Sequence, residues 1–270
     1  MAALQIVPDQ DYRGKGISEG LARGLLVFVS GENLTGEGMG IGSVAIRNDE
    51  RTIFSRTRTD TGDIRTGMTR TYFIDTGMAW GFRGQVSPLL TKLIESAVSM
   101  YMHHPRLQGL LMGPVMPLRN LLSIHPVFEA VPRVAEVRVT YRVTGSDIDI
   151  RVIVHPCSRL TGTVCILNEL AGDRFVAGWN DGRIPPPPGW EEIPFRFPTC
   201  SLIDPDRGVR FWIRDVTSSP DLPVALFWGR EQGGDLSWAG FSLEIGPLDT
   251  GRELEFEYSV GFEEGNGVIL

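Results

Sequence analysis

The sequence predicts a mainly β protein: a large antiparallel two-layer β-sandwich with one main α-helix, about residues 88–104, packed at one end. Apolar and polar residues alternate strictly over 136–154 and again over 253–260. The 32 glycines and 18 prolines fall between short apolar runs, where turns need them. A period of two gives each strand one dry face, and the dry faces of two sheets must pack together.

Length and charge limit the other possibilities. A β-rich chain of 270 residues can form one domain spanning 1–270, and the alternative is two domains, 1–184 and 189–270, separated by the stiff run Pro185–Pro188. The net charge of −7 and pI near 5.2 argue against nucleic acid, because phosphate binding requires a basic surface.

Cysteine usage and hydropathy suggest a cytoplasmic protein. Three widely spaced cysteines without a CxxC pair indicate neither a zinc site nor a disulfide framework. The first ten residues do not resemble a secretion signal, and no apolar run reaches the roughly 18 residues of a membrane span. We therefore expect no membrane partner, no metal and no organic cofactor.

The first third of the chain contains strands and charged turns. An apolar run at 25–29 predicts a strand, and the glycine-rich stretch 31–42 predicts a long hairpin connection, because it fits neither the dinucleotide fingerprint nor a P-loop. Residues 48–70 predict a solvated edge, with a cationic rim for an acidic ligand as the alternative. The arginines of this segment are Arg51, Arg56, Arg58, Arg65 and Arg70.

One stretch predicts a helix. Ser87 is a good N-cap and Pro88 suits the first helical position, and apolar residues follow at spacings of three and four up to Tyr101. We expect this helix to end near His103-His104-Pro105 and the apolar, proline-broken segment 107–128 to form turns and short helical pieces.

The segment 136–154 predicts a β-hairpin with a defined register. If Gly145-Ser146 forms a two-residue type II′ loop, with glycine at positive φ, the apolar residues of the two strands face each other. The expected pairs are Val143 with Ile148, Arg142 with Asp149, Tyr141 with Ile150, and Val139 with Val152.

Acid/base candidates are few. The chain contains neither GxSxG nor HExxH. His155 ends a strongly predicted strand, where functional loops gather, although most strand-end histidines are ordinary surface residues. Glu231 follows an apolar strand and is placed at the mouth of the core, although a salt bridge in a loop is the more common role for such a residue. We retain both as candidate catalytic residues.

Four residues are candidate ligand contacts. Val209, Phe211 and Ile213 alternate with Arg210, Trp212 and Arg214, which predicts an exposed Arg-Trp-Arg row on a concave sheet face. Trp228 ends a buried strand and is the fourth candidate. Rings stack on the apolar faces of sugars and guanidinium groups bind their hydroxyls, although most tryptophans are core residues.

The second half of the chain resembles the large β-sandwich of galactose-mutarotase-like proteins. The resemblance lies in the order of VRVTYRVTGSDIDIRVIVHP, VCILNELAGDRF and LEFEYSVGF, over about residues 130–262. It implies a sandwich fold and a carbohydrate ligand. The Asn-His and Tyr-Phe motifs of that family are missing, and Cys157-Ser158 follow His155-Pro156, so no catalytic residue is carried over.

Together these features predict a carbohydrate-binding or carbohydrate-processing protein that acts by cofactor-free acid/base chemistry on a sugar or sugar acid. Whether it is an enzyme stays open. One alternative is a non-enzymatic assembly protein, in which the acidic strand Glu253 to Glu257 pairs with an arginine-rich edge of another copy, which would make a homo-oligomer. A second alternative is a β-barrel that encloses an apolar small molecule.

Overall fold

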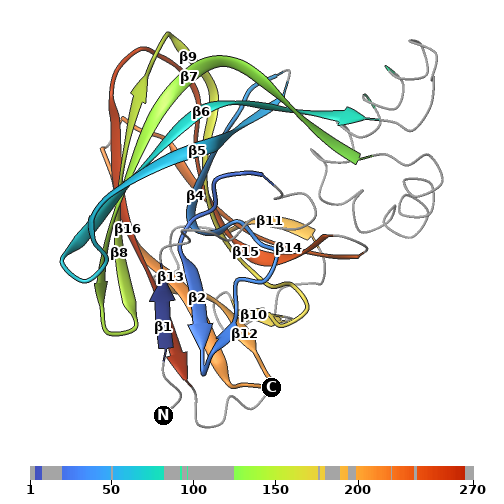
Figure 1. Cartoon of the computed structure of the whole chain (residues 1–270), viewed down its shortest axis with the longest axis vertical. Coiled ribbons are helices and arrows are strands. Elements are labelled where there is room, and N and C mark those ends of the chain that lie inside the picture. Colours follow the sequence, from blue (N-terminus) through green and yellow to red (C-terminus); the bar gives the residue numbers. More distant parts are fainter. Residues whose placement is uncertain are drawn as a thin grey trace.

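The computed structural model describes residues 4–7, 20–49, 51–81, 92, 96, 125–175, 177–179, 189–193, 199–219, 221–233 and 236–264. These residues form strands, turns and connecting loops (Figure 1). The strands are β1 Leu4–Val7, β2 Leu26–Val29, β3 Glu32–Asn33, β4 Gly40–Arg47, β5 Thr52–Asp63, β6 Gly67–Gly81, β7 His125–Thr144, β8 Asp147–Pro156, β9 Leu160–Leu170, β10 Ala177–Trp179, β11 Gly189–Ile193, β12 Thr199–Asp204, β13 Val209–Ser218, β14 Val224–Gly233, β15 Leu236–Thr250 and β16 Leu254–Glu264.

The predicted fold class needs correction. The protein is mainly β, as predicted. The expected main helix at one end of the sandwich is not found, because only strands are defined among the described residues. Of the range 88–104 only Lys92 and Ser96 are described, both with helical backbone, and the rest lies outside the described residues. Periodicity identified an amphipathic pattern there but carried no information on where such a segment would pack.

The main sheet is one continuous sheet rather than two separate layers. Its thirteen strands have the order β10-β12-β13-β16-β8-β7-β6-β5-β4-β9-β15-β14-β11, and every pairing is antiparallel. The described strands do not close this sheet into a barrel, because β10 and β11 form its two ends. A small sheet, β1-β2-β3, lies beside it.

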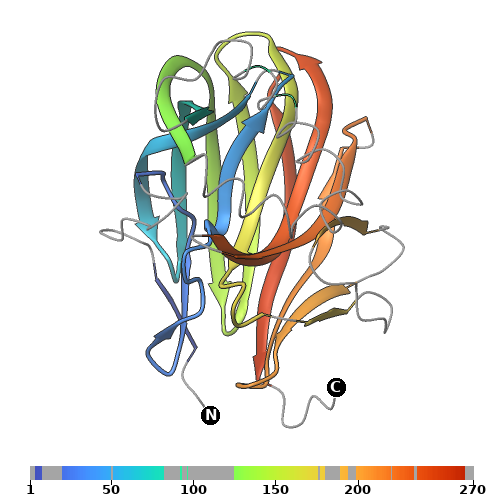
Figure 2. The same ribbon diagram turned by 90° about the vertical axis from the view of Figure 1, so that its right-hand side faces the viewer.

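The large sheet curls so that its distant parts meet (Figure 2). Phe211 in β13 and Phe241 in β15 are far apart in the strand order, yet their ring centroids lie 5.4 Å apart. Tyr258 in β16 donates a 2.9 Å hydrogen bond to Asn168 in β9. The inner face of the curled sheet therefore packs against itself and encloses the core.

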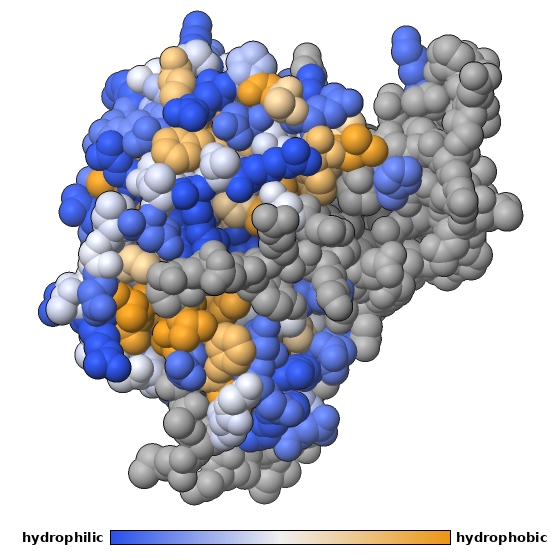
Figure 3. All heavy atoms as spheres, in the orientation of Figure 1, coloured by the Kyte–Doolittle hydropathy of each residue, from blue (hydrophilic) through white to orange (hydrophobic). Residues whose placement is uncertain are grey.

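The core also includes the segment before β4. Leu25, Val27 and Leu34 are buried together with the inner residues of the large sheet. Strands on both sides of the proline run share this sheet and core, whereas Pro185–Pro188 itself lies outside the described residues. The view in Figure 3 shows a mostly hydrophilic described surface, with a hydrophobic area toward its lower left and smaller hydrophobic patches in its upper half.

The predicted hairpin is confirmed in register. Val143 pairs with Ile148, Arg142 with Asp149, Tyr141 with Ile150 and Val139 with Val152. Gly145 has a φ of +66°, as the predicted loop requires. The strand β7 begins earlier than expected, at His125, and its pairing with β6 shifts between Ala130 and Ala135. Pro132 lies in this irregular segment, and because it has no N–H it cannot donate a hydrogen bond to a neighbouring strand.

The acidic C-terminal strand is not a sheet edge. β16 lies between β13 and β8, and its outward residues Glu255 and Glu257 face Arg151 of β8. Arg151 lies 2.6 Å from Glu255 and 3.5 Å from Glu257. β16 is therefore not a free edge that could pair with another copy, whereas the assembly alternative itself stays a prediction.

Candidate functional site

The predicted Arg-Trp-Arg row lies on β13, but on the outer face of the sheet. Phe211 and Ile213 pack into the core, so the residues between and beside them point the opposite way. The expectation of a concave face is therefore wrong, because the concave face is filled by the core. Ser201 in β12 lies directly opposite Trp212 and shares its face.

Trp212 is enclosed rather than exposed, with only 3% of its surface accessible. Its neighbour in β16 is Gly261, and a Cβ atom at that position would overlap the indole ring. On the ring lies the guanidinium of Arg214, with its central carbon 4.1 Å from the ring centroid. The indole is thus held between a glycine backbone and a cation.

Two carboxylates hold Arg214 in this position. Asp147 and Asp215 each lie 3.2 Å from its guanidinium, and the side chains of Arg214, Asp147 and Asp215 are 43%, 39% and 68% accessible. Asp215 has a φ of 56°, at a point where the pairing of β13 with β16 shifts. A cation–π contact contributes about 0.5–1 kcal/mol at exposed sites and about 2 kcal/mol when desolvated, and an exposed ion pair contributes at most about 1 kcal/mol. The position of Arg214 over the ring is therefore stabilised by about 1–3 kcal/mol.

On the part of this face formed by β12 and β13, three polar atoms of the described residues are buried without a hydrogen-bond partner. They are Ser201 Oγ, Arg210 Nε and Trp212 Nε1. Ser201 and Trp212 are opposite each other, and Arg210 is two residues from Trp212 on the same face. Each atom can donate a hydrogen bond, and an unpaired buried donor costs about 1–3 kcal/mol. We call Ser201, Arg210 and Trp212 the donor cluster. Three adjacent donors without acceptors indicate a site for a ligand rich in oxygen acceptors.

His155 lies on the same outer face but not beside the donor cluster. Its Nδ1 lies 2.8 Å from Glu253, and its Nε2 is buried without a partner. Along β16, Arg214 is level with Ser259 and His155 with Glu253, six residues away. At about 3.3 Å per residue this separation is about 20 Å. The structure therefore does not bring His155 and the predicted ligand contacts together.

The remaining two predicted site residues lie on β14. Trp228 is 5% exposed and belongs to the core cluster. The backbone of Glu231 pairs with Trp238, and its side chain lies outside the described part of the structure. β14 is far from β13 and β8 in the strand order.

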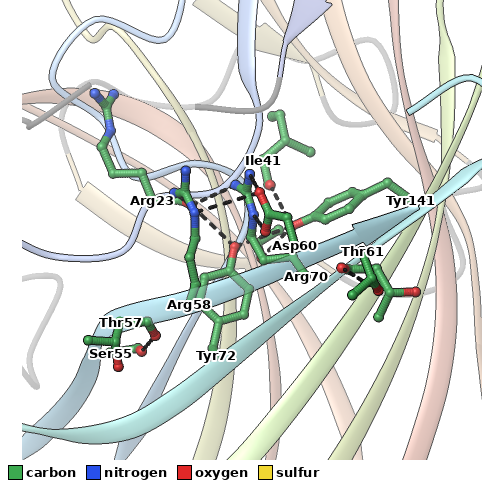
Figure 4. A network of polar contacts seen from close by, with 12 residues as sticks. Arg23, Ile41, Ser55, Thr57, Arg58, Asp60, Thr61, Arg70, Tyr72 and Tyr141 are labelled. Atoms are coloured by element: carbon green, nitrogen blue, oxygen red, sulfur yellow. Dashed lines mark hydrogen bonds and ion pairs between the residues drawn. The ribbon is translucent and has the colours of Figure 1, made fainter. Parts of the chain in front are cut away.

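A buried arginine–tyrosine network, which the sequence did not predict, lies on the inner face (Figure 4). The guanidinium of Arg70 is fully buried and donates two 2.8 Å hydrogen bonds to Asp60. Arg58 and Arg70 both donate to the carbonyl oxygen of Arg23, at 2.8 and 2.9 Å. Burial opposes the charge of Arg70, but Tyr72 and Asp60 outweigh it and raise its pKa. The run of arginines at 48–70 was the available signal, and two of these arginines point inward instead of forming a solvated edge.

Three tyrosines extend this network through the core. Tyr72 OH lies 3.3 Å from Tyr141 OH, and Tyr141 donates to the carbonyl of Gly42 at 3.0 Å. Burial, followed by the proximity of Tyr72, raises the pKa of Tyr141 well above its ordinary value. Burial likewise raises the pKa of Tyr258. The hydroxyls of Tyr141 and Tyr258 therefore stay protonated at neutral pH. Tyr72 and Tyr141 donate to backbone carbonyls of Arg23 and Gly42 and so hold this region against the sheet, whereas Tyr258 donates to Asn168 of β9.

The described residues offer neither a metal-ligand cluster nor a membrane-spanning helix. Among them, no group of three His, Cys, Asp or Glu side chains is close enough together to hold a metal ion. The same residues include no helix long and apolar enough to cross a membrane.

Comparison with solved structures finds similar chains at low sequence identity. A mutant of the heparan sulfate lyase HepC from Pedobacter heparinus matches with a TM-score of 0.44 and 9% identity, over 90% of this chain and 30% of the lyase. A galactose mutarotase-like protein from Lactobacillus casei ATCC 334 matches with a TM-score of 0.42 and 9% identity, over 97% and 100% of the two chains. A galactose mutarotase related enzyme from Lactobacillus acidophilus matches with a TM-score of 0.38 and 9% identity, over the full length of both.

The resemblance to galactose-mutarotase-like proteins is thereby confirmed as a resemblance. At these TM-scores and identities it assigns neither a family nor an activity to this chain. The chain spans 30% of the length of the matched lyase. No protein-family model and no curated protein sequence matches it.

Proposed function

We propose that this protein binds a carbohydrate, a sugar or sugar acid, at the donor cluster of Ser201, Arg210 and Trp212. The observation that carries the proposal is the presence of three buried donors without partners on one face of β12 and β13. A ligand that supplied acceptors to all three would remove their desolvation penalty on binding. Hydroxyl and ring oxygens of a sugar are such acceptors.

The indole ring supports the same class of ligand. The apolar face of a sugar packs on an aromatic ring, and Trp212 places such a ring next to the donors, beneath the guanidinium of Arg214. Small-molecule sites combine an apolar surface with a few placed polar groups, and the donor cluster has both.

Acid/base chemistry on a sugar is a second candidate function, favoured by one observation. Glu253 holds Nδ1 of His155 and leaves Nε2 without a partner, an arrangement that orients an imidazole for proton transfer. The separation of about 20 Å from the Arg214 level along the strands means that His155 would need a separate site. The main proposal therefore concerns binding.

Two matched serine variants test the binding proposal. Ser201→Ala removes one donor of the cluster, whereas Ser242→Ala removes a serine hydroxyl in β15 that is also buried and without a partner. Since neither hydroxyl is paired in the protein, we expect neither change to lower stability. Calorimetric titration with glucose, galactose, glucuronate and galacturonate should show binding to the wild type, about three- to tenfold weaker in Ser201→Ala and unchanged in Ser242→Ala.

The proposal fails if none of the four sugars binds the wild type. It fails equally if Ser242→Ala weakens binding as much as Ser201→Ala does, because the effect would then not come from the donor cluster.

A further inference from the structure

Arg214 occupies the ring surface on which a sugar would stack. Its guanidinium lies 4.1 Å over the Trp212 ring centroid, while Trp212 Nε1 remains without a partner. The arginine is attached to the site by a cation–π contact and by two carboxylates that are themselves exposed. It therefore covers the ring without satisfying the donors beside it.

Carboxylates outnumber guanidinium groups around the site. Arg214 has Asp147 and Asp215 as partners, and Arg210 Nη1 lies 3.7 Å from Glu263. Two guanidinium groups thus face three carboxylates. An anionic ligand would meet more negative than positive charge here, whereas a neutral ligand meets no such penalty.

The position of Arg214 favours its displacement by a ligand, and the excess of carboxylates favours an uncharged ligand; the inference rests on the proposed carbohydrate site. We infer that Arg214 is a displaceable cover and that the site takes a neutral sugar. On binding, Arg214 leaves the ring and stays near Asp147 and Asp215, the apolar face of the sugar replaces the guanidinium, and sugar oxygens accept hydrogen bonds from the donor cluster.

The inference predicts that removing the cover strengthens binding. Arg214→Ala abolishes the competition for the ring, so glucose or galactose should bind about three- to thirtyfold more tightly than to the wild type. Arg138→Ala is the matched control: Arg138 is an exposed arginine on the same face of the sheet and is paired with Glu136 at 3.0 Å. This control should bind like the wild type. Each neutral sugar should bind more tightly than its acid, glucuronate or galacturonate.

Calorimetric titration of the three proteins with the four sugars separates the outcomes. Weaker binding of the neutral sugars by Arg214→Ala would overturn the inference and make Arg214 a direct ligand contact. Unchanged binding would also overturn it, because Arg214 would then not compete with the sugar for the Trp212 ring. Tighter binding of the acids would overturn the neutral ligand class while leaving carbohydrate binding intact. Absence of binding by both the wild type and Arg214→Ala would overturn the carbohydrate proposal itself.

Discussion

Trp212 packs closely on Gly261 because glycine has no Cβ atom. The indole crosses the strand β16 where its neighbour has no side chain, and a Cβ there would overlap the ring. Because both partners lie within a thirteen-stranded sheet, neither backbone can easily move away. The glycine therefore fixes where the ring, and with it the donor cluster, lies.

Gly261→Ala should destabilise the protein and disturb the site. Overpacking of this kind typically costs about 1–3 kcal/mol in the free energy of unfolding. Gly251→Ala is a suitable control, because a Cβ at Gly251 would meet nothing within 4 Å. Urea unfolding of both variants measures the difference, and equal midpoints for the two would contradict the packing described for Trp212.

Buried arginines on the inner face show how charge is accommodated in a core. Arg70 is fully buried, and its forked donors are used by Asp60 and by the carbonyl of Arg23. A lysine at position 70 lacks the planar fork needed to serve both acceptors. The residues between Gly20 and Gly42 are thereby tied to β5 and β6, through backbone carbonyls that have no sequence signature.

Among the strands, the hairpin of β7 and β8 is the element that depends most on local sequence. Its alternation places Val139, Tyr141, Ile150 and Val152 in the core, and its loop uses the positive φ of Gly145. A slip of one residue would turn all of these side chains to solvent. The hydrophobic pattern and the turn therefore specify the same register.

Gly145→Ala should weaken this hairpin through the backbone alone. A Cβ at this position would meet nothing within 4 Å, so the cost of about 1 kcal/mol comes from the left-handed conformation. Gly145→Asn should cost less, because asparagine tolerates this region. Thermal unfolding of the two variants compares them, and a wild-type melting temperature for Gly145→Ala would show that the loop is not strained by a side chain.

At the scale of the whole chain, the curl of the sheet buries groups that titrate at high pH. Burial raises the pKa of the Cys165 thiol from its ordinary 9.0 to about 12. It also raises the pKa of Tyr141 well above 10.0. The unfolded chain loses these protons at lower pH than the folded protein does, so between about pH 9 and 12 the unfolded state binds fewer protons.

The free energy of unfolding should therefore fall as pH rises above about 9, with each such group contributing at most about 1.4 kcal/mol per pH unit. Urea unfolding between pH 8 and 11 measures the decline. In Cys165→Ala the first part of the decline should be smaller, because the tyrosines titrate later. A flat profile up to pH 11 would contradict the burial of these groups.

Where the alternation is regular, local pattern was enough to predict strands and their inward residues, because a period of two is a property of the backbone itself. It did not predict the inward Arg58 and Arg70, or the strand that begins at His125. It predicted the hairpin register, the core residues of β16 and the row formed by Arg210, Trp212 and Arg214. It did not reveal which face of the curled sheet this row would occupy, nor that Arg214 would cover Trp212 and leave three donors unpaired. The partners that fix the ring and its cover, Gly261 of β16 and Asp147 at the start of β8, are far from β13 in the sequence. Their placement beside β13 depends on the order of strands in the sheet, which no short stretch of sequence encodes.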